Sequence, residues 1–178
     1  LQPSLKPQAQ IAICLPTFLG CQGQTASTQG LGAKLWVGRY QEIEEYLKTA
    51  ECVSMSGSDP RKAARCTLRP GGPVARMAWR PLPPGIYKGF WESYKTEIAA
   101  YELDKLLKLD MVPPSVERQL QGIEGAAQLW VDGASGVKEG DAPGEPNRTH
   151  WDNQLVRIAM FDNLIGNRER NLGNMLRD

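Results

Sequence analysis

Among the stretches of this sequence, Trp91 to Leu107 places the strongest limit on the folds that the chain can adopt. Its letters, WESYKTEIAAYELDKLL, predict an amphipathic helix, because Tyr94, Ile98 and Tyr101 fall on one stripe at helical spacing. The chain has 178 residues, of which 41% are hydrophobic and 23% charged. That is enough for one domain with a substantial core and too little for two large ones. We therefore expect an α+β fold in which a small, mostly antiparallel sheet packs on this helix.

The segment before this helix predicts another helix, a hairpin and a third strand. Leu35–Ala50 has apolar residues at helical spacing. Cys52–Ser56 and Ala63–Leu68 have strand patterns, and the residues between them are typical of a turn. Val74–Leu82 predicts the third strand, which carries Arg80 near its end.

Two cysteines flank the predicted turn at equal distances. A simple hairpin would place Cys52 and Cys66 opposite one another. A disulfide fits an exported domain. Two buried thiols fit equally well, because cross-strand bridges strain the geometry of the bond.

The segment after the central helix predicts two strands, a loop and a final helix. The strands are expected at Ser115–Gln121 and Ala127–Val131, with a turn over residues 122–125. The polar segment that follows, rich in Gly, Pro and acidic residues, predicts a mobile loop at 133–148. Thr149 and Asp152 form a capping-box pattern for a helix that ends near residue 165.

The last stretch, FDNLIGNRERNLGNMLRD, holds an acid followed five positions later by an amide. On a loop after a helix, such an acid, Glu169, can accept a proton from an attacking hydroxyl. The amide oxygen of Asn174 can hold a metal ion that bridges phosphates. The same residue types also form ordinary solvated turns, so this pair alone leaves both interpretations open.

Residues 164–174 resemble the catalytic loop of the atypical kinases, which include the phosphatidylinositol 3- and 4-kinases, secretory-pathway kinases and related bacterial kinase-like proteins. The helix from Tyr94 to Leu107, followed by Val112-Pro113, resembles the corresponding helix of that family. The resemblance implies a protein-kinase-like N-lobe, formed by a small antiparallel sheet and one main helix, with the start of a helical C-lobe. It also implies ATP and Mg²⁺ as cofactors, Glu169 as the catalytic acid and Asn174 as a metal ligand.

The resemblance assigns nucleotide-binding roles to four residues of the implied N-lobe. Arg80 takes the position of the lysine that holds the nucleotide phosphates, and Glu97 is its ion-pair partner on the helix. Gln128 and Trp130 belong to the segment that would contact the adenine.

Two departures from the family affect the expected function. Glu169 replaces the catalytic Asp, and Arg80 replaces Lys. By resemblance, the second metal-binding Asp of the family would lie further along the chain than Asp178, which is only four residues after Asn174. We therefore expect a fragment of a kinase-like domain, an ATP-dependent phosphotransferase by resemblance, that is inactive in this form. The alternative is a non-catalytic, pseudokinase-type exported module for binding or structure. The phosphate acceptor is undetermined.

The N-terminal segment resembles an export leader. Lys6 precedes a short apolar run, Ile11–Leu19, and the Gly-Cys pair ending at Cys21 resembles a bacterial lipoprotein processing box. We expect residues before Cys21 to pack little, with the protein exported to a bacterial periplasm or anchored to a membrane through a lipidated Cys21. The alternative is a cytoplasmic protein with an accidental apolar patch.

Composition limits the remaining partners. The net charge of +1 gives no basis for nucleic-acid binding, and the single histidine, His150, excludes a multi-histidine metal site.

The expected division of the chain is a leader at 1–21, a flexible tether at 22–34, a kinase-like N-lobe and hinge at 35–132, a mobile loop at 133–148, and a C-lobe helix with the catalytic-loop-like segment at 149–178.

Overall fold

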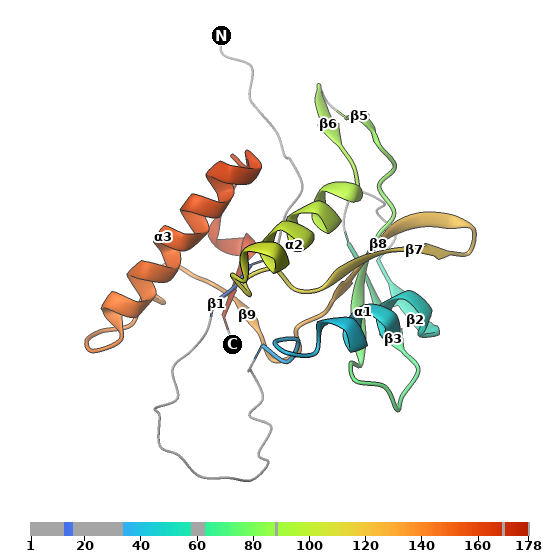
Figure 1. Ribbon diagram of the computed structural model, residues 1–178, viewed down its shortest axis with the longest axis horizontal. Coiled ribbons are helices and arrows are strands. Elements are labelled where there is room, and N and C mark those ends of the chain that lie inside the picture. Colours follow the sequence, from blue (N-terminus) through green and yellow to red (C-terminus); the bar gives the residue numbers. More distant parts are fainter. Residues whose placement is uncertain (1–12, 16–33, 58–62, 88, 169, 178) are drawn as a thin grey trace.

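The computed structural model describes residues 13–15, 34–57, 63–87, 89–168 and 170–177, and only the backbone of residues 14, 15 and 90. In these residues the chain forms a five-stranded antiparallel sheet, three α-helices, and two smaller sheets (Figure 1). The expected α+β class is confirmed.

The main sheet has the strand order β2-β3-β4-β8-β7. Its members are β2 (Cys52–Ser56), β3 (Ala64–Leu68), β4 (Arg76–Arg80), β8 (Ile123–Leu129) and β7 (Ser115–Leu120), and all neighbours run antiparallel. The predicted hairpin and third strand are confirmed.

Strand β8 begins four residues earlier than the predicted strand, because the turn before it is tighter than expected. Gln121 and Gly122 alone form that turn, with φ of 51° and 82°. Gly125, assigned to the turn from sequence, lies inside β8. A Cβ at Gly125 would come within 2.7 Å of the Arg80 carbonyl oxygen, so this glycine permits the close approach of β8 to β4.

Helix α1 (Tyr40–Thr49) packs on one face of this sheet. Ile43 and Leu47, one turn apart, are fully buried in the same core cluster as Met77 and Trp79 of β4. The helix begins five residues later than predicted, because residues 35–38 form a turn.

Helix α2 (Lys95–Leu107) lies between the main sheet and the rest of the molecule (Figure 1). The prediction that it starts at Trp91 is wrong, because residues up to Glu92 belong to a separate hairpin. That hairpin consists of β5 (Gly85–Tyr87) and β6 (Phe90–Glu92). The helix follows Ser93, whose hydroxyl accepts a hydrogen bond from the Lys95 amide at 3.1 Å.

Helix α3 (Arg148–Ile165) confirms the predicted final helix, but the predicted capping box is wrong. No side chain caps its N-terminus at Asn147. Asp152 instead pairs with Arg148 at 3.0 Å, one turn along the helix. The helix ends at Gly166, whose φ of 70° suits a residue without a Cβ.

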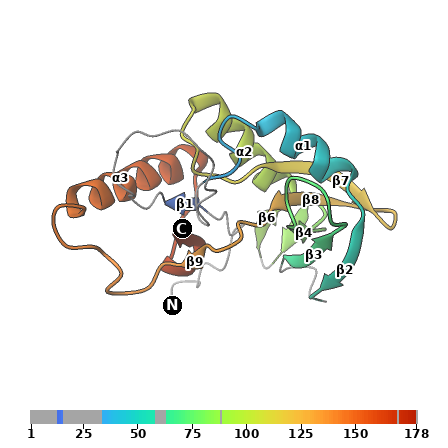
Figure 2. The ribbon, with the colours of Figure 1, turned by 90° about the horizontal axis from the view of Figure 1, so that it is seen from below.

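A second core joins α2 and α3 to a small sheet with the order β1-β10-β9, which lies beside α3 in Figure 2. The strands are β1 (Ile13–Leu15), β10 (Met175–Arg177) and β9 (Ser135–Gly136). β1 and β10 are parallel, with Ile13 opposite Met175. This sheet corrects two expectations. Ile13, within the predicted leader, is fully buried, although little packing was expected before Cys21, and the predicted loop at 133–148 contributes a strand. The rest of the predicted leader, apart from residues 14 and 15, lies outside the described residues.

Cys52 and Cys66 form a disulfide with their Cα atoms 5.8 Å apart. The prediction that they lie opposite one another is wrong. The register shifts between Cys52 and Ser54, so that Cys66 faces Met55 and Cys52 faces Leu68. Apart from Cys52, all residues of β2 are exposed. The disulfide therefore attaches β2 covalently to the buried side of β3.

The expected lipidation site, Cys21, and the expected tether up to residue 33 lie outside the described residues. Among the helices that the structure does describe, none combines the length and apolar character required to cross a membrane.

Candidate functional site

One face of the main sheet carries three arginines, and we call it the arginine face. Side chains alternate along a strand and directly paired residues share a face. The pairs Arg65 with Ala78 and Thr67 with Arg76 therefore place these four residues on the same side, together with Arg80 at the end of β4. Arg65 and Thr67 are exposed, whereas Arg80 is buried. The face is thus open over β3 and closed at Arg80.

Arg80 and Glu97 form a buried ion pair at the closed end. An η-nitrogen of Arg80 donates to Oε1 of Glu97 at 2.5 Å, and the two side chains are only 9% and 7% exposed. The predicted approach of these residues to within ion-pair distance is confirmed. Burial raises the pKa of the Glu97 carboxyl above its ordinary value, while the charge and hydrogen bond of Arg80 act in the opposite direction.

Arg80 has hydrogen-bonding capacity that this pair does not use. Its Nε is buried and has no hydrogen-bond partner among the described residues. A guanidinium presents five N–H groups in a planar fork, and buried donors are nearly always satisfied in folded proteins. A buried, unpartnered donor on a cation is suited to an anionic ligand such as a phosphate.

Glu97 belongs to a buried stripe on α2 that makes two other polar contacts. The Tyr101 hydroxyl, one turn further on, donates to Glu44 of α1 at 2.5 Å. Asp104 accepts the backbone N–H of Met111 at 3.1 and 3.2 Å, where the chain leaves the helix. Burial raises the pKa of Asp104 to about 6. These contacts attach the buried stripe of α2 to α1 and to the segment that follows the helix.

The two residues predicted to lie near the adenine, Gln128 and Trp130, differ in their burial and contacts. The Gln128 side chain is buried in the sheet and donates to the Ser115 hydroxyl at 2.9 Å. Trp130 is half-buried, and its ring lies 5.8 Å from the guanidinium of Arg65 and 5.7 Å from that of Arg76. The Trp130 amide already donates to the Arg76 carbonyl at 3.2 Å, so a ligand here would meet its ring.

A pocket of about 470 Å³ lies at the end of the sheet remote from Arg80. Trp130 and Thr67 line it from the arginine face, together with Asp132 and the β3–β4 turn over residues 70–75. This volume lies within the range typical of small-molecule sites.

The catalytic-loop-like segment is organised by Asp162 near the end of α3. This carboxylate accepts two hydrogen bonds from Arg170, at 2.7 and 2.9 Å, and one from the Asn167 side chain at 2.8 Å. Arg170 also donates to the backbone carbonyl of Asn174 at 3.0 Å. Asn174 itself ends a short 3₁₀ helix (Leu172–Asn174). The buried Asp162 carboxylate thus holds Asn167 and Arg170, and Arg170 in turn holds the Asn174 carbonyl.

Sequence reasoning missed Asp162, although it stands just before the predicted motif. The sequence signal was an acidic residue near the end of the helix, placed where it can pair with Arg170 of the loop that follows. Glu169, predicted as the catalytic acid, lies outside the described residues. The hydrogen bonds and ion pairs of the described residues join Arg80 to Glu97 and Asp162 to the Asn174 segment, but they do not join these two groups to each other.

The described part of the chain has no cluster of three or more His, Cys, Asp or Glu side chains that could hold a metal ion. Asn174, the residue predicted to ligate magnesium, therefore has no such cluster beside it in the described part. Comparison of the chain with protein-family models, curated proteins and solved structures finds no match.

Proposed function

We propose that this chain binds a magnesium nucleotide through a kinase-like N-lobe and is an ATP-dependent phosphotransferase domain of the atypical kinase group. The observation that carries the proposal is the buried Arg80–Glu97 pair, with its unpartnered Arg80 Nε. In protein kinases a cation on the strand before the main helix holds the phosphates and pairs with a glutamate of that helix. Here a strand and a helix supply the same two charges in the same chain order.

The arrangement of the arginine face supports a ligand of nucleotide shape. Arg76 and Arg80 are four residues apart on β4, which corresponds to roughly 13 Å along a strand. An extended nucleoside triphosphate has a comparable length. Its base would lie near the Trp130 ring and the pocket beside it, and its phosphates would extend along the arginine face toward Arg80.

The second half of the proposed site comes from the Asn174 segment. Magnesium, when bound, neutralises charge that develops on the transferred phosphoryl group. Asn174 would supply one oxygen ligand to that ion, and Glu169 would accept the proton of the attacking hydroxyl. Asp162 positions this segment by holding Asn167 and Arg170.

A non-catalytic nucleotide-binding module is the second candidate. It is favoured by Arg80, whose broad guanidinium stands where kinases carry a compact ammonium, and by Glu169, which is one methylene longer than Asp. A displacement of about 1 Å at a reacting group can lower the rate on the order of 100-fold.

Nucleotide titration in the presence of magnesium tests the proposal. The informative variant is the double substitution Arg80→Met with Glu97→Leu, which removes the cation without leaving its partner buried and charged. We expect this variant to fold and to lose measurable Mg-ATP binding by calorimetry, while Arg80→Lys retains binding. Arg39→Met is the matched control, because Arg39 is exposed and pairs with Glu42 three residues further on.

The outcomes separate the candidates. Mg-ATP binding that the double variant loses supports the proposed site. ATP hydrolysis that Glu169→Gln abolishes would favour a phosphotransferase over the non-catalytic module and would contradict the expectation that it is inactive in this form, whereas binding without hydrolysis is expected for both candidates. Equal Mg-ATP affinity in wild-type protein and the folded double variant contradicts the proposed site.

A further inference from the structure

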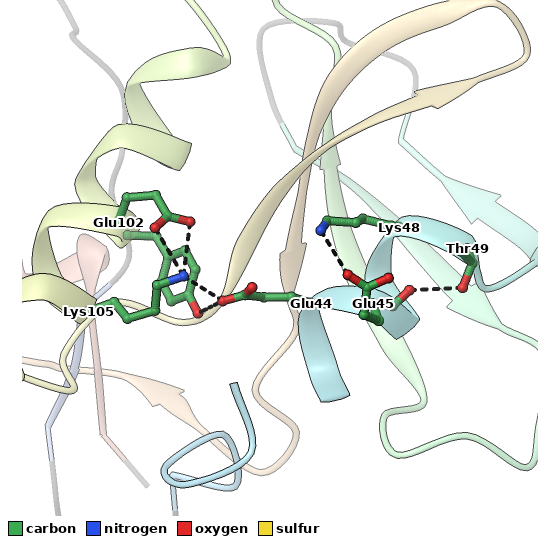
Figure 3. Close-up of polar contacts among 7 residues, drawn as sticks. Glu44, Glu45, Lys48, Thr49, Glu102 and Lys105 are labelled. Atoms are coloured by element: carbon green, nitrogen blue, oxygen red, sulfur yellow. Dashed lines mark hydrogen bonds and ion pairs between the residues drawn. The ribbon is translucent and has the colours of Figure 1, made fainter. Parts of the chain in front are cut away.

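Helix α1 is connected to α2 by one acidic side chain. Figure 3 shows Glu44 extending from α1 toward Lys105 of α2, while its neighbour Glu45 pairs with Lys48 on α1 itself. The Glu44 carboxylate accepts hydrogen bonds from the Tyr101 hydroxyl at 2.5 Å and from Nζ of Lys105 at 2.8 Å. Its side chain is 17% exposed, so both contacts are largely shielded from water.

The charges at this junction keep the Glu44 carboxylate, which accepts both hydrogen bonds, ionised at neutral pH. Burial acts to raise the pKa of the Glu44 carboxyl, but the hydrogen bonds from Lys105 and Tyr101 and the charge of Lys105 bring it below its ordinary value. Burial and the neighbouring Glu44 raise the pKa of the Tyr101 hydroxyl, which therefore remains a donor at neutral pH. Lys105 also lies 4.9 Å from the centroid of the Tyr101 ring. One carboxylate thus holds two adjacent groups of α2.

The junction lies one helical turn from the candidate site. Glu97 and Tyr101 are four residues apart and are both buried on α2, so they lie on the same stripe, roughly 6 Å apart along the helix axis. A rotation of α2 that released Tyr101 from Glu44 would also turn Glu97 away from Arg80. Helix α1 is held independently near its C-terminus, because Arg118 of β7 donates to the Leu47 carbonyl at 2.8 Å. Helix α1 is therefore a fixed support against which α2 is held.

We propose that Glu44 is a positioning residue: through Tyr101 and Lys105 it holds α2 in the rotation that pairs Glu97 with Arg80, and thereby maintains the nucleotide site. The role in nucleotide binding rests on the proposed function. The pairing itself does not, and it can be measured without any nucleotide.

The test compares Glu44→Gln and Tyr101→Phe with Glu45→Gln in the full chain. The control removes the same charge from the adjacent position, where the partner, Lys48, is an exposed residue of the same helix at 3.1 Å. The first measurement is the side-chain Nε–H signal of Arg80 in a ¹H–¹⁵N spectrum, assigned by its loss in Arg80→Lys. We expect Glu44→Gln and Tyr101→Phe to shift or broaden this signal and Glu45→Gln to leave it unchanged.

The second measurement is Mg-ATP affinity, for which we expect about a tenfold loss in Glu44→Gln and none in Glu45→Gln, a typical coupling between linked sites. An unchanged Arg80 signal in folded Glu44→Gln overturns the proposal, even if the melting temperature falls, because a merely structural contact would lower stability alone. Should Glu44→Gln not fold, Tyr101→Phe decides on the same criterion. If wild-type protein binds no Mg-ATP while the Arg80 signal still responds to Glu44→Gln, the proposed function fails and the positioning of Glu97 stands.

Discussion

Removal of Glu97 alone should cost far more stability than removal of the whole ion pair. In Glu97→Leu the Arg80 side chain, which is 9% exposed in the ion pair, stays buried without its counter-charge. Breaking a buried pair in this way typically lowers the free energy of unfolding by about 3–5 kcal/mol. For a chain of this size each kcal/mol lowers the melting temperature by about 2–4 °C, which gives a decrease of about 6–20 °C. In the double variant Arg80→Met with Glu97→Leu, apolar side chains replace both charges, and stability should be near that of the wild type or above it.

Urea unfolding followed by circular dichroism measures these differences. The matched control is Asp152→Leu, which breaks the Arg148–Asp152 pair on α3, whose side chains are 52% and 50% exposed. An exposed pair of this kind contributes about 1 kcal/mol or less. A loss below about 1 kcal/mol in Glu97→Leu, or a double variant as unstable as the single one, would refute the reasoning that the pair is a desolvated unit.

Three further predictions concern other parts of the fold. Because burial raises the pKa of Asp104 to about 6 from 3.8, the native state binds a proton more tightly than the unfolded chain. Its contribution to stability is therefore present below about pH 4 and lost as pH rises to about 6, by roughly 3 kcal/mol, and unfolding curves of Asp104→Asn should lack this decrease. Replacing Cys52 and Cys66 by Ser should lower the free energy of unfolding by about 3 kcal/mol, since the disulfide closes a loop of 14 residues, and wild-type protein in a thiol reductant should match the variant. Asp162→Ala should remove the carboxylate that pairs with the partly buried Arg170 and lower stability by about 3 kcal/mol, as measured by urea unfolding, and a loss as small as that of an exposed pair would contradict the role of Asp162 in the loop.

Local patterns predicted the elements whose signal lies within a few residues. The hairpin of β2 and β3 and the helix α3 were recognised because their periodicity is uninterrupted. The start of α2 was misplaced because aromatic residues such as Trp91 are accepted by both helices and strands. Gly89, with a φ of 87°, allows the chain to turn back as a hairpin before the helix begins.

The candidate site required more than local pattern. No spacing rule connects Arg80 on β4 to Glu97 on α2, and only the resemblance to a kinase helix suggested that they meet. The role of Asp162 was missed because its partners come from the loop after the helix, where the return of the chain cannot be inferred from periodicity. Likewise, Ile13 belonged to an apolar run that matched an export leader, since a short buried strand and a leader share the same composition.

The parallel pairing of β1 with β10 has a consequence for the order in which the molecule folds. Ile13 and Met175 are neighbours in space but far apart in the sequence, whereas the strands of the main sheet are mostly joined by short turns. Contacts between residues distant in sequence form slowly, because closing a long loop costs entropy before the contacts contribute any stability. During synthesis β1 must also wait until the residues of β10 have been made. The main sheet can therefore assemble first, and the segment that carries Asn174 reaches its final arrangement last.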